Sequence, residues 1–418
     1  MALAVVVFVV GLAVIATEKV HRTKVALLGA ALVVVTNTIE QEQAVEAIDF
    51  DTIGLLTGMM LMVRLTEPTG AYNYLAIRAG QLAKGRPLGV VIALTGTTAV
   101  LSAFLDNLTT ILLMVPITFL LADTLDIPAI PLLMMEIIAS NIGGTATLIG
   151  DPPNILIAGA TGLSFNDFAL NLAPVAIVTL LVVITSLYLF YRRRLQIDPA
   201  NGAKVMALDA RRSIEDPDEL RRTLPILVLT IVAFFFHNLL GIEPATVALT
   251  GAVVMLLVSR QSLEEALAGI EWPTLFFFLG LFVMVGALEV TGAIDQVAEG
   301  VAALTGGNRT AELLGIAWIS AFGSAVVDNI PFTAAMIPVV EQLQGDAGGD
   351  NAYWWALSLG ACFGGNATLI AAAANVAASG LAERAGQPIS FLQFLWVGVP
   401  VTVLSMAIAT LYIALRYL

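Results

Sequence analysis

The segment Ser102-Ala-Phe-Leu-Asp106-Asn107 recurs in the second half of the chain as Ser324-Ala-Val-Val-Asp328-Asn329. Each copy is followed at the same distance by a proline, and each lies between two long apolar arms. A carboxylate between apolar arms is costly in a membrane, so an acid in such a segment indicates a functional site. Its occurrence in two copies is typical of a transporter that consists of two related halves around a central site.

The composition is that of a polytopic membrane protein. Of the 418 residues, 58% are hydrophobic and only 12% are charged, whereas soluble domains contain about 25% charged residues. Many apolar stretches reach the roughly 17–25 residues that span a bilayer as a helix. The first of them, residues 2–17, lacks a basic flank and a cleavage site, so we expect it to be retained as a helix.

Charge and the rarity of reactive residues exclude several function classes. The net charge of −13 argues against a nucleic-acid partner. The single cysteine and two histidines leave no multi-thiolate metal site, and no sequence pattern of a hydrolase or a nucleotide-binding enzyme is present. We therefore expect no enzyme activity, no cofactor and no metal site.

The apolar stretches predict an all-α polytopic membrane protein with about ten transmembrane helices and two hairpins. The hairpins, residues 88–121 and 311–342, each consist of two arms that meet at an Asp-Asn pair, and we expect both to be re-entrant. Discontinuous helices are expected over residues 131–160 and 354–381. The predicted uninterrupted spans are residues 2–17, 24–36, 51–67, 168–191, 224–240, 244–259, 273–290 and 394–415.

The basic residues predict which side of the membrane each loop faces. Most of the 19 lysines and arginines, among them Arg22 and the run Arg192 to Arg194, fall on one side, and the positive-inside rule makes that side cytoplasmic. We therefore expect a multi-pass protein of the cell (inner or plasma) membrane with both termini outside. Its first half would be residues 1–191, its cytoplasmic linker residues 192–223 and its second half residues 224–418.

The match between the halves extends well beyond the two aspartates. Thr23-Lys-Val-Ala-Leu-Leu-Gly29 corresponds to Ala245-Thr-Val-Ala-Leu-Thr-Gly251, and the segment from Gly143 corresponds to the segment from Gly364. Each half is predicted to have an odd number of crossings, so the second half enters the membrane from the opposite face. The sequence therefore predicts two inverted-topology repeats about an axis in the membrane plane.

The sequence Gly143-Gly-Thr-Ala-Thr-Leu-Ile-Gly-Asp151-Pro-Pro-Asn154 lies within a span but cannot sustain a regular helix, because proline removes an N–H group and clashes with the preceding turn. Broken helices expose N–H and C=O ends, which bind anionic and cationic groups. We expect the two breaks and the two hairpin tips to enclose one site. The candidate substrate- or ion-binding residues are Asp106, Asn107, Thr109, Thr145, Thr147, Asp151, Asn154, Asp328, Asn329, Asn366, Thr368 and Asn375.

Three acids are candidates for carrying a coupling proton. A carboxyl group that is buried away from water can take up and release a proton near neutral pH. Asp106 and Asp328 could do so, or they could bind a cation or accept hydrogen bonds from a hydroxylated solute. Glu136 lies half a helix before the first break. It could carry the proton or lie solvated near the cytoplasmic end of its span, and the sequence does not decide between these alternatives.

The two Asp-Asn segments, together with Gly-Gly-Thr-Ala-Thr-Leu-Ile-Gly-Asp-Pro-Pro-Asn, resemble the arsenite permease (ArsB) and NhaD-type antiporter branch of the ion transporter superfamily. P-protein-like chains with a citrate-transporter-like domain share these motifs. The resemblance covers the chain from Thr23 to its end. It implies a secondary transporter with inverted repeats and alternating access, dimeric in many members. The arsenite members export arsenite and antimonite hydroxides, either on the proton gradient or with a soluble ATPase.

The charge of the tips bears on the substrate. Two carboxylates would repel a dicarboxylate, whereas they suit a neutral polyhydroxyl solute such as As(OH)3, or a cation. We therefore predict a secondary exporter of arsenite or antimonite that is driven by the proton motive force and confers arsenical resistance. The alternatives are a sodium/proton antiporter and a transporter of another small inorganic or organic anion. The expected partners are the solute, H+ or Na+ and membrane lipid, while a homodimer and a soluble ATPase partner stay open.

Overall fold

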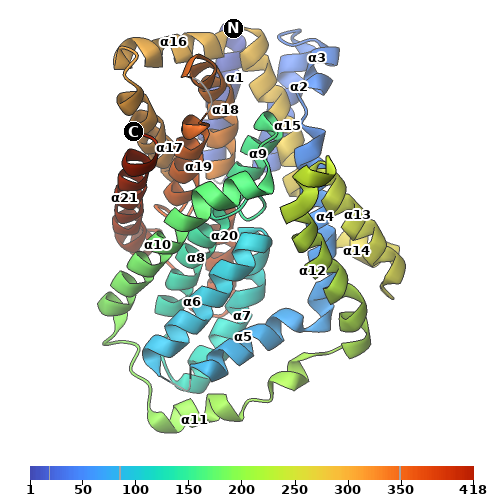
Figure 1. The fold of residues 1–418 in the computed structure, drawn as a ribbon, viewed down its shortest axis with the longest axis vertical. Coiled ribbons are helices and arrows are strands. Elements are labelled where there is room, and N and C mark those ends of the chain that lie inside the picture. The colour runs from blue at the N-terminus through green and yellow to red at the C-terminus, as the bar shows by residue number, and fades with distance from the viewer. Residues whose placement is uncertain (18, 84–85, 348–349) are drawn as a thin grey trace.

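The structure is a computed structural model that describes residues 1–17, 19–83, 86–347 and 350–418, and every regular element within them is a helix (Figure 1). The first half contains α1 (Ala2–Ala16), α2 (Arg22–Val35), α3 (Gln41–Glu46), α4 (Phe50–Thr66), η1 (Glu67–Thr69), α5 (Ala71–Leu82), α6 (Pro87–Phe104), α7 (Asn107–Leu125), α8 (Ala129–Thr145), α9 (Pro152–Thr161) and α10 (Phe165–Tyr191). The all-α prediction is confirmed for these residues.

After a connector, the second half repeats this order of helices, without a counterpart of η1 among the described residues. The connector contains α11 (Pro199–Ala207) and η2 (Ala210–Ser213). The second half contains α12 (Pro217–Leu240), α13 (Pro244–Val258), α14 (Leu263–Ala268), α15 (Trp272–Val290), α16 (Ala293–Thr305), α17 (Arg309–Val326), α18 (Asn329–Ala347), α19 (Ala352–Gly364), α20 (Ala373–Arg384) and α21 (Phe391–Arg416).

The predicted segments correspond to these helices in order. The first predicted hairpin is α6 and α7, the second is α17 and α18, and each pair meets at its Asp-Asn segment. The predicted discontinuous helices are α8–α9 and α19–α20, which residues 146–151 and 365–372 interrupt. The sequence did not predict α5 and α16, which lie across opposite ends of the molecule (Figure 1).

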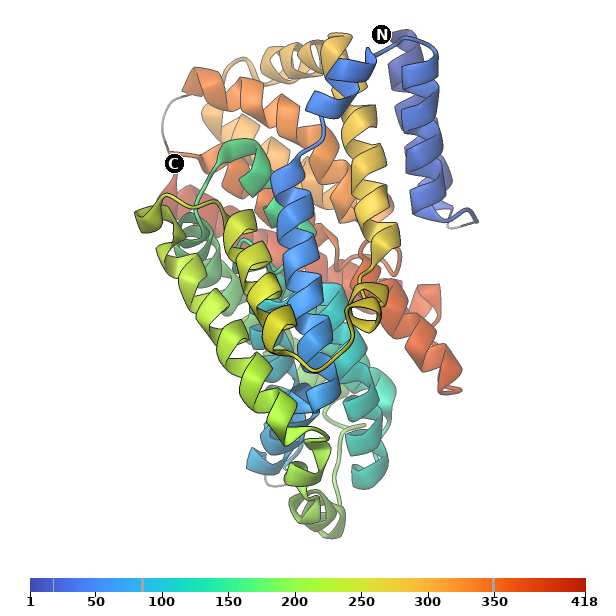
Figure 2. The same ribbon diagram turned by 90° about the vertical axis from the view of Figure 1, so that its right-hand side faces the viewer.

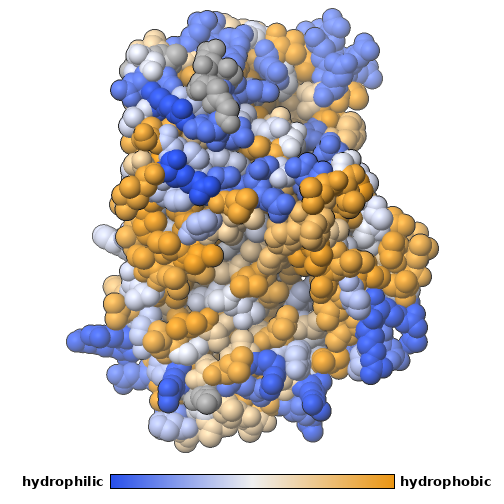
Figure 3. All heavy atoms as spheres, viewed as in Figure 1, coloured by the Kyte–Doolittle hydropathy of each residue, from blue (hydrophilic) through white to orange (hydrophobic). Residues whose placement is uncertain are grey.

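Six helices in the described part of the chain are long and apolar enough to cross a membrane, namely α6, α7, α10, α12, α15 and α21. Three shorter helices, α1, α8 and α13, are also apolar. On the face shown in Figure 3, hydrophobic side chains predominate across the middle and hydrophilic ones gather towards both ends. These features indicate a multi-pass membrane protein. The number of crossings and the re-entrant course of the hairpins stay predictions.

The two hairpins enter the molecule from opposite ends. The α6–α7 pair rises from the end that carries the connector, and the α17–α18 pair descends from the end that carries α16 (Figures 1 and 2). Their tips meet in the interior, where Asn107 and Asn329 both contact Asp151. This is the arrangement that an inverted repeat predicts.

Equivalent helices of the two halves pack crosswise. In the first contact α4 packs on α13, and in the second α15 packs on α2. A methyl group placed on Gly58 of α4 would come within 2.6 Å of the carbonyl carbon of Ala248, and one placed on Gly280 of α15 would come equally close to Ala26. Small residues let helix backbones approach closely in membranes. Because the repeat pairs Gly58 with Gly280 and Ala248 with Ala26, the same contact occurs twice and interlocks the halves.

We expect Gly58→Ala and Gly280→Ala to lower the midpoint of thermal unfolding in detergent. Alanine normally stabilises a helix by roughly 0.5–1 kcal/mol relative to glycine, but here its methyl group would meet backbone atoms, and overpacking costs about 1–3 kcal/mol. Gly96→Ala is the matched control, because a methyl group on that helical glycine meets nothing within 4 Å. A midpoint for Gly58→Ala at or above that of Gly96→Ala would contradict the close packing.

Candidate functional site

The Asp-Asn turns form the tips of the two hairpins, and they differ in geometry. Asp106 caps α7, where its carboxylate accepts hydrogen bonds from the N–H of Thr109 at 2.8 Å and from the hydroxyl of the same residue. Asp328 accepts the N–H of Ile330 at 2.9 Å. The φ angle is −69° at Asp106 but 152° at Asp328, a value that non-glycine residues rarely adopt. The second tip therefore holds backbone strain that the first tip lacks.

One buried carboxylate joins the two tips. Oδ1 of Asp151 accepts a hydrogen bond from Nδ2 of Asn107 and another from Nδ2 of Asn329, each at 3.2 Å. All three side chains are buried. The two asparagines are equivalent in the repeat, whereas Ala372 stands at the position equivalent to Asp151. A single acid of the first half thus serves both hairpins, and its Oδ2 has no hydrogen-bond partner in the described structure.

A chain of buried amides extends from this acid to the second break. Asn141 accepts a hydrogen bond from Asn107 at 3.2 Å and donates to Oδ1 of Asn366 at 3.1 Å and of Asn375 at 2.9 Å. Nδ2 of Asn366 has no partner within the described residues. Asn141 was not among the predicted site residues, because Cys362 stands at the equivalent position in the other half and the repeat therefore did not single Asn141 out.

Each break is closed by an asparagine in the same way. Nδ2 of Asn154 donates to the carbonyl oxygens of Thr145 at 3.1 Å and Thr147 at 2.8 Å. The equivalent Asn375 donates to the carbonyl oxygen of Thr368 at 2.9 Å. Carbonyl groups that a broken helix exposes must be satisfied by protein or water at this depth. These amides satisfy them from within the protein.

The threonine hydroxyls of the breaks also bind backbone. Thr147 donates to the carbonyl oxygen of Ala103, and the equivalent Thr368 donates to that of Ala325 at 2.7 Å. Each bond ties a break to the first arm of its own hairpin. The hydroxyl of Thr145 donates one turn back along α8 at 2.8 Å. The predicted residues of the tips and breaks therefore lie together, but the break residues are engaged with the protein itself.

Glu136 lies apart from the tips, between α6, α7 and α8. Its carboxylate is buried and accepts hydrogen bonds from the hydroxyl of Thr118 at 2.6 Å and from that of Thr98 at 3.5 Å. The alternative in which Glu136 is solvated near the end of its span is therefore wrong. Its proton-carrying role stays a prediction, because the structure places it away from the central acids.

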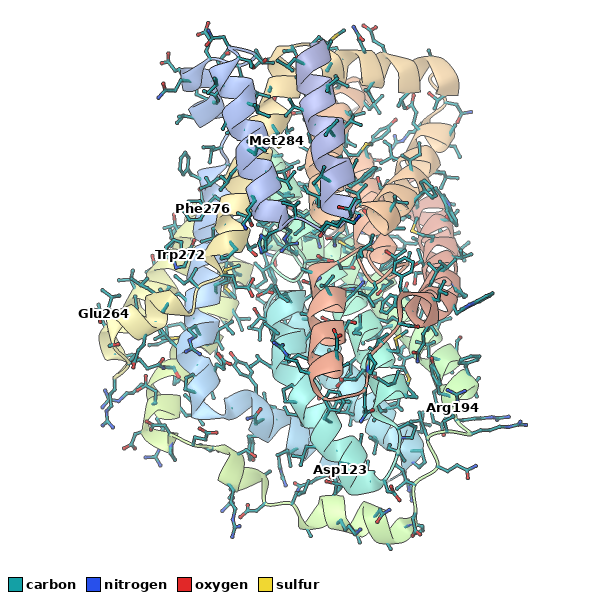
Figure 4. All side chains as sticks on the ribbon, turned by 180° about the vertical axis from the view of Figure 1, so that it is seen from behind. Asp123, Arg194, Glu264, Trp272, Phe276 and Met284 are labelled. Carbon is teal, nitrogen blue, oxygen red and sulfur yellow. The ribbon has the colours of Figure 1, made fainter. Side chains whose placement is uncertain are left out.

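Two cavities lie beside the tips. The larger, about 550 Å3, is lined by Arg22, Glu271 and Asp328 together with the start of α15 and the first turns of α20. The smaller, about 20 Å3, borders Asp106, both tip asparagines and again Arg22 and Glu271. The turn between α1 and α2, which forms part of the larger cavity, lies midway along the molecule above α20 (Figure 4). The tip acids, rather than the polar side chains of the breaks, thus face open space.

The cavities are not symmetric. Arg22 and Thr274 line the larger cavity. Their counterparts in the repeat, Pro244 and Thr52, line a cavity of only about 160 Å3. The space beside the tips is therefore larger on the side of Arg22 than on the side of Pro244, although the halves are equivalent. This is the state expected of a transporter that exposes its site alternately.

Arg22 and Glu271 are site residues that the sequence analysis missed. Nη1 of Arg22 lies 3.2 Å from Oδ2 of Asp328, and the two side chains are 21% and 8% exposed. The positive-inside rule placed Arg22 in a solvated cytoplasmic loop, because most loop arginines of a membrane protein lie at its surface. The sequence does indicate that Arg22 is unusual, because Pro244 stands at the equivalent position of the other half.

Comparison with known proteins agrees with this architecture. Residues 12–360 match the citrate transporter family, CitMHS. The chain belongs to the citrate transporter family. It is 45% identical over 421 residues to an uncharacterised transporter of Mycobacterium tuberculosis, covering 99% of this chain and 98% of that protein. It is 41% identical to the 46 kDa membrane protein of Mycobacterium leprae, covering 100% and 99% of the two chains.

Two further likenesses are more distant. The human P protein is 34% identical over 490 residues, which cover 97% of this chain and 58% of the P protein. The crystal structure of the Alcanivorax borkumensis YdaH transporter has a TM-score of 0.61 at 14% identity, covering 89% of this chain and 86% of that one. At that identity the likeness shows the fold alone. The predicted membership of the ArsB and NhaD-type branch lies beyond these findings, whereas the transporter family and the P-protein-like relatives are shown.

We expect Asp151→Ala to lower the midpoint of thermal unfolding far more than Asp151→Asn. The alanine leaves the buried Asn329 amide without its acceptor, and a buried unsatisfied group costs about 1–3 kcal/mol. The asparagine keeps an oxygen at that position. Asp123→Ala, on the exposed surface of α7, is the control. If Asp151→Ala and Asp123→Ala unfold at the same temperature, Asp151 does not hold the tips together.

Proposed function

We propose that this member of the citrate transporter family is a secondary exporter of arsenite or antimonite that is driven by the proton motive force. The observation that supports it is the charge around the cavities, where Asp106, Asp328 and Glu271 face Arg22. Arsenite is a neutral trihydroxide at neutral pH. Its hydroxyl groups would donate hydrogen bonds to carboxylate oxygens without adding charge to the site.

The same charges argue against citrate, which gives the family its name. Two like charges 4 Å apart repel by about 4 kcal/mol at an effective dielectric constant of about 20. Among the described residues that line these cavities, Arg22 is the only lysine or arginine, and it is already paired with Asp328. A citrate ion would therefore meet more negative than positive charge.

A sodium/proton antiporter is the second candidate, and the state of Asp106 favours it. Among the described residues its carboxylate accepts hydrogen bonds only from its own turn at the start of α7, so it keeps lone pairs free for a cation. A carboxylate that binds either a proton or Na+ could exchange one for the other. Transport of another small anion has no comparable support from the lining residues.

The orientation that we propose suits an exporter. If the connector with its arginines is cytoplasmic and both termini are outside, the end of the molecule below the α1–α2 turn faces the cytoplasm (Figures 1 and 4). The larger cavity lies on that side of the turn, between the start of α15 and α20. An exporter takes up its substrate from that side.

We expect everted membrane vesicles from an arsenite-pump-deficient strain to accumulate arsenite when they contain this protein, and to lose the accumulation when an uncoupler is added. Uptake that persists with the uncoupler would contradict coupling to the proton gradient. A lack of uptake under an intact gradient would favour the antiporter. In that case addition of sodium to acid-loaded vesicles should release protons.

We expect Asp106→Asn and Asp328→Asn each to lower gradient-driven arsenite accumulation by roughly tenfold or more, the change that a loss of about 1.4 kcal/mol produces. The amide keeps the shape of the side chain but removes its charge and its capacity to exchange a proton. Asp123→Asn, at an exposed position of α7, should transport like the unaltered protein. If both tip variants transport normally, the assigned site is wrong.

Glu136→Gln tests the third proton-coupling candidate. Glutamine can keep the hydrogen bond with Thr118 but cannot carry a proton. If Glu136 takes part in coupling, the variant should lose accumulation against a gradient while it still equilibrates arsenite down a gradient. Uptake of labelled arsenite, measured with and without a proton gradient, separates the two activities. If the variant accumulates as much arsenite as the unaltered protein, Glu136 takes no part in coupling, and Asp106 and Asp328 stay the candidates.

A further inference from the structure

The ion pair between Arg22 and Asp328 connects the start of α2 with the second hairpin tip. Besides its 3.2 Å contact with the carboxylate, the guanidinium group lies 3.5 Å from the hydroxyl of Thr274 and 5.1 Å from the ring centroid of Phe277. A carboxylate, a hydroxyl and an aromatic face therefore hold the cation in one place. Arginine is suited to such a position because its charge is permanent and its planar group stacks on aromatic rings.

Within the part of the chain that the structure describes, the first hairpin tip has no equivalent cation. The repeat pairs Arg22 with Pro244 and Asp328 with Asp106, so the counterpart of the ion pair would join a proline to an acid. The ion pairs found among the described residues do not include Asp106. Two equivalent tips therefore carry carboxylates in different states, one with a tethered counter-ion and one without.

The strained backbone of Asp328 shows that its carboxylate is held towards Arg22. A residue at a φ of 152° persists there only when its surroundings fix it. One carboxylate oxygen accepts the N–H of Ile330, the other contacts Arg22, and the N–H of Asn329 binds the carbonyl oxygen of Ala371 at 3.1 Å. A carboxylate buried to this degree requires a counter-charge or a proton.

We propose that Arg22 is a built-in cation that neutralises Asp328 in place of a dissolved one, and that it thereby determines which ions the transporter uses. The proposal deepens the transport function proposed above and rests on it. With Arg22 present, the second tip needs neither sodium nor a proton in this state. The first tip, through Asp106, is then the only one of the two free to exchange an ion with the solution.

Removal of Arg22 should create a sodium site at Asp328. We would purify the unaltered protein, Arg22→Gln, Arg22→Lys and the double variant Arg22→Gln/Asp328→Asn in detergent. Thermal unfolding would be followed in sodium chloride and in choline chloride of equal concentration. An ion that binds only the folded protein raises the midpoint of thermal unfolding. The midpoint of Arg22→Gln should therefore be about 3 °C or more higher in sodium chloride than in choline chloride. Sodium bound at Asp106 would affect all four proteins alike, so the difference between the salts should be about 3 °C or more smaller in the other three proteins than in Arg22→Gln.

Each result decides the proposal. A folded Arg22→Gln variant whose sodium response does not exceed that of the unaltered protein overturns the proposal, as does an excess response that survives in the double variant. If Arg22→Gln does not fold but the double variant does, the uncompensated charge of Asp328 is the cause and the proposal holds. If neither folds, Arg22 is needed for another reason and the proposal fails. The measurement contains no arsenite, so its outcome is independent of whether arsenite is the substrate.

Discussion

Polar groups in the interior of a membrane protein must find their partners within the protein, and Asp151 meets this demand for both hairpins at once. Its Oδ1 accepts one amide from each tip. The amides of Asn107 and Asn141 connect this acid to Asn375 in the second half. Asn154 and Asn375 satisfy the carbonyl groups that the two breaks expose. The tips can carry acids in an apolar setting because this buried network fixes the backbone around them.

The frame of the molecule is symmetric, but its charges are not. The hairpins, breaks and crosswise helix contacts all occur twice. By contrast, Asp151 corresponds to Ala372, and Arg22 corresponds to Pro244. Packing and the two tip aspartates therefore follow the repeat, whereas the charged residues in contact with the tips, Asp151 and Arg22, depart from it. The protein keeps two equivalent structural halves while assigning different electrostatic roles to them.

The symmetry also explains how much the sequence could predict. Glycine, proline and asparagine at the breaks recur in register, so the hairpins and discontinuous helices were predicted from local sequence alone. Arg22 and Glu271 were not found, because their role depends on the α1–α2 turn reaching the depth of the hairpin tips, which charge counting does not reveal. The helices α5 and α16 were missed because, at 12 and 13 residues, they are shorter than the roughly 17–25 residues expected of a span.

The crosswise contacts of Gly58 with Ala248 and of Gly280 with Ala26 have a consequence for biosynthesis. Because α2 packs on α15 and α4 packs on α13, neither helix of the first half has its partner when it leaves the ribosome. Both must wait in the bilayer, with their small-residue faces uncovered, until α13 and α15 of the second half have been inserted. The two halves therefore interlock only after the ribosome has passed α15.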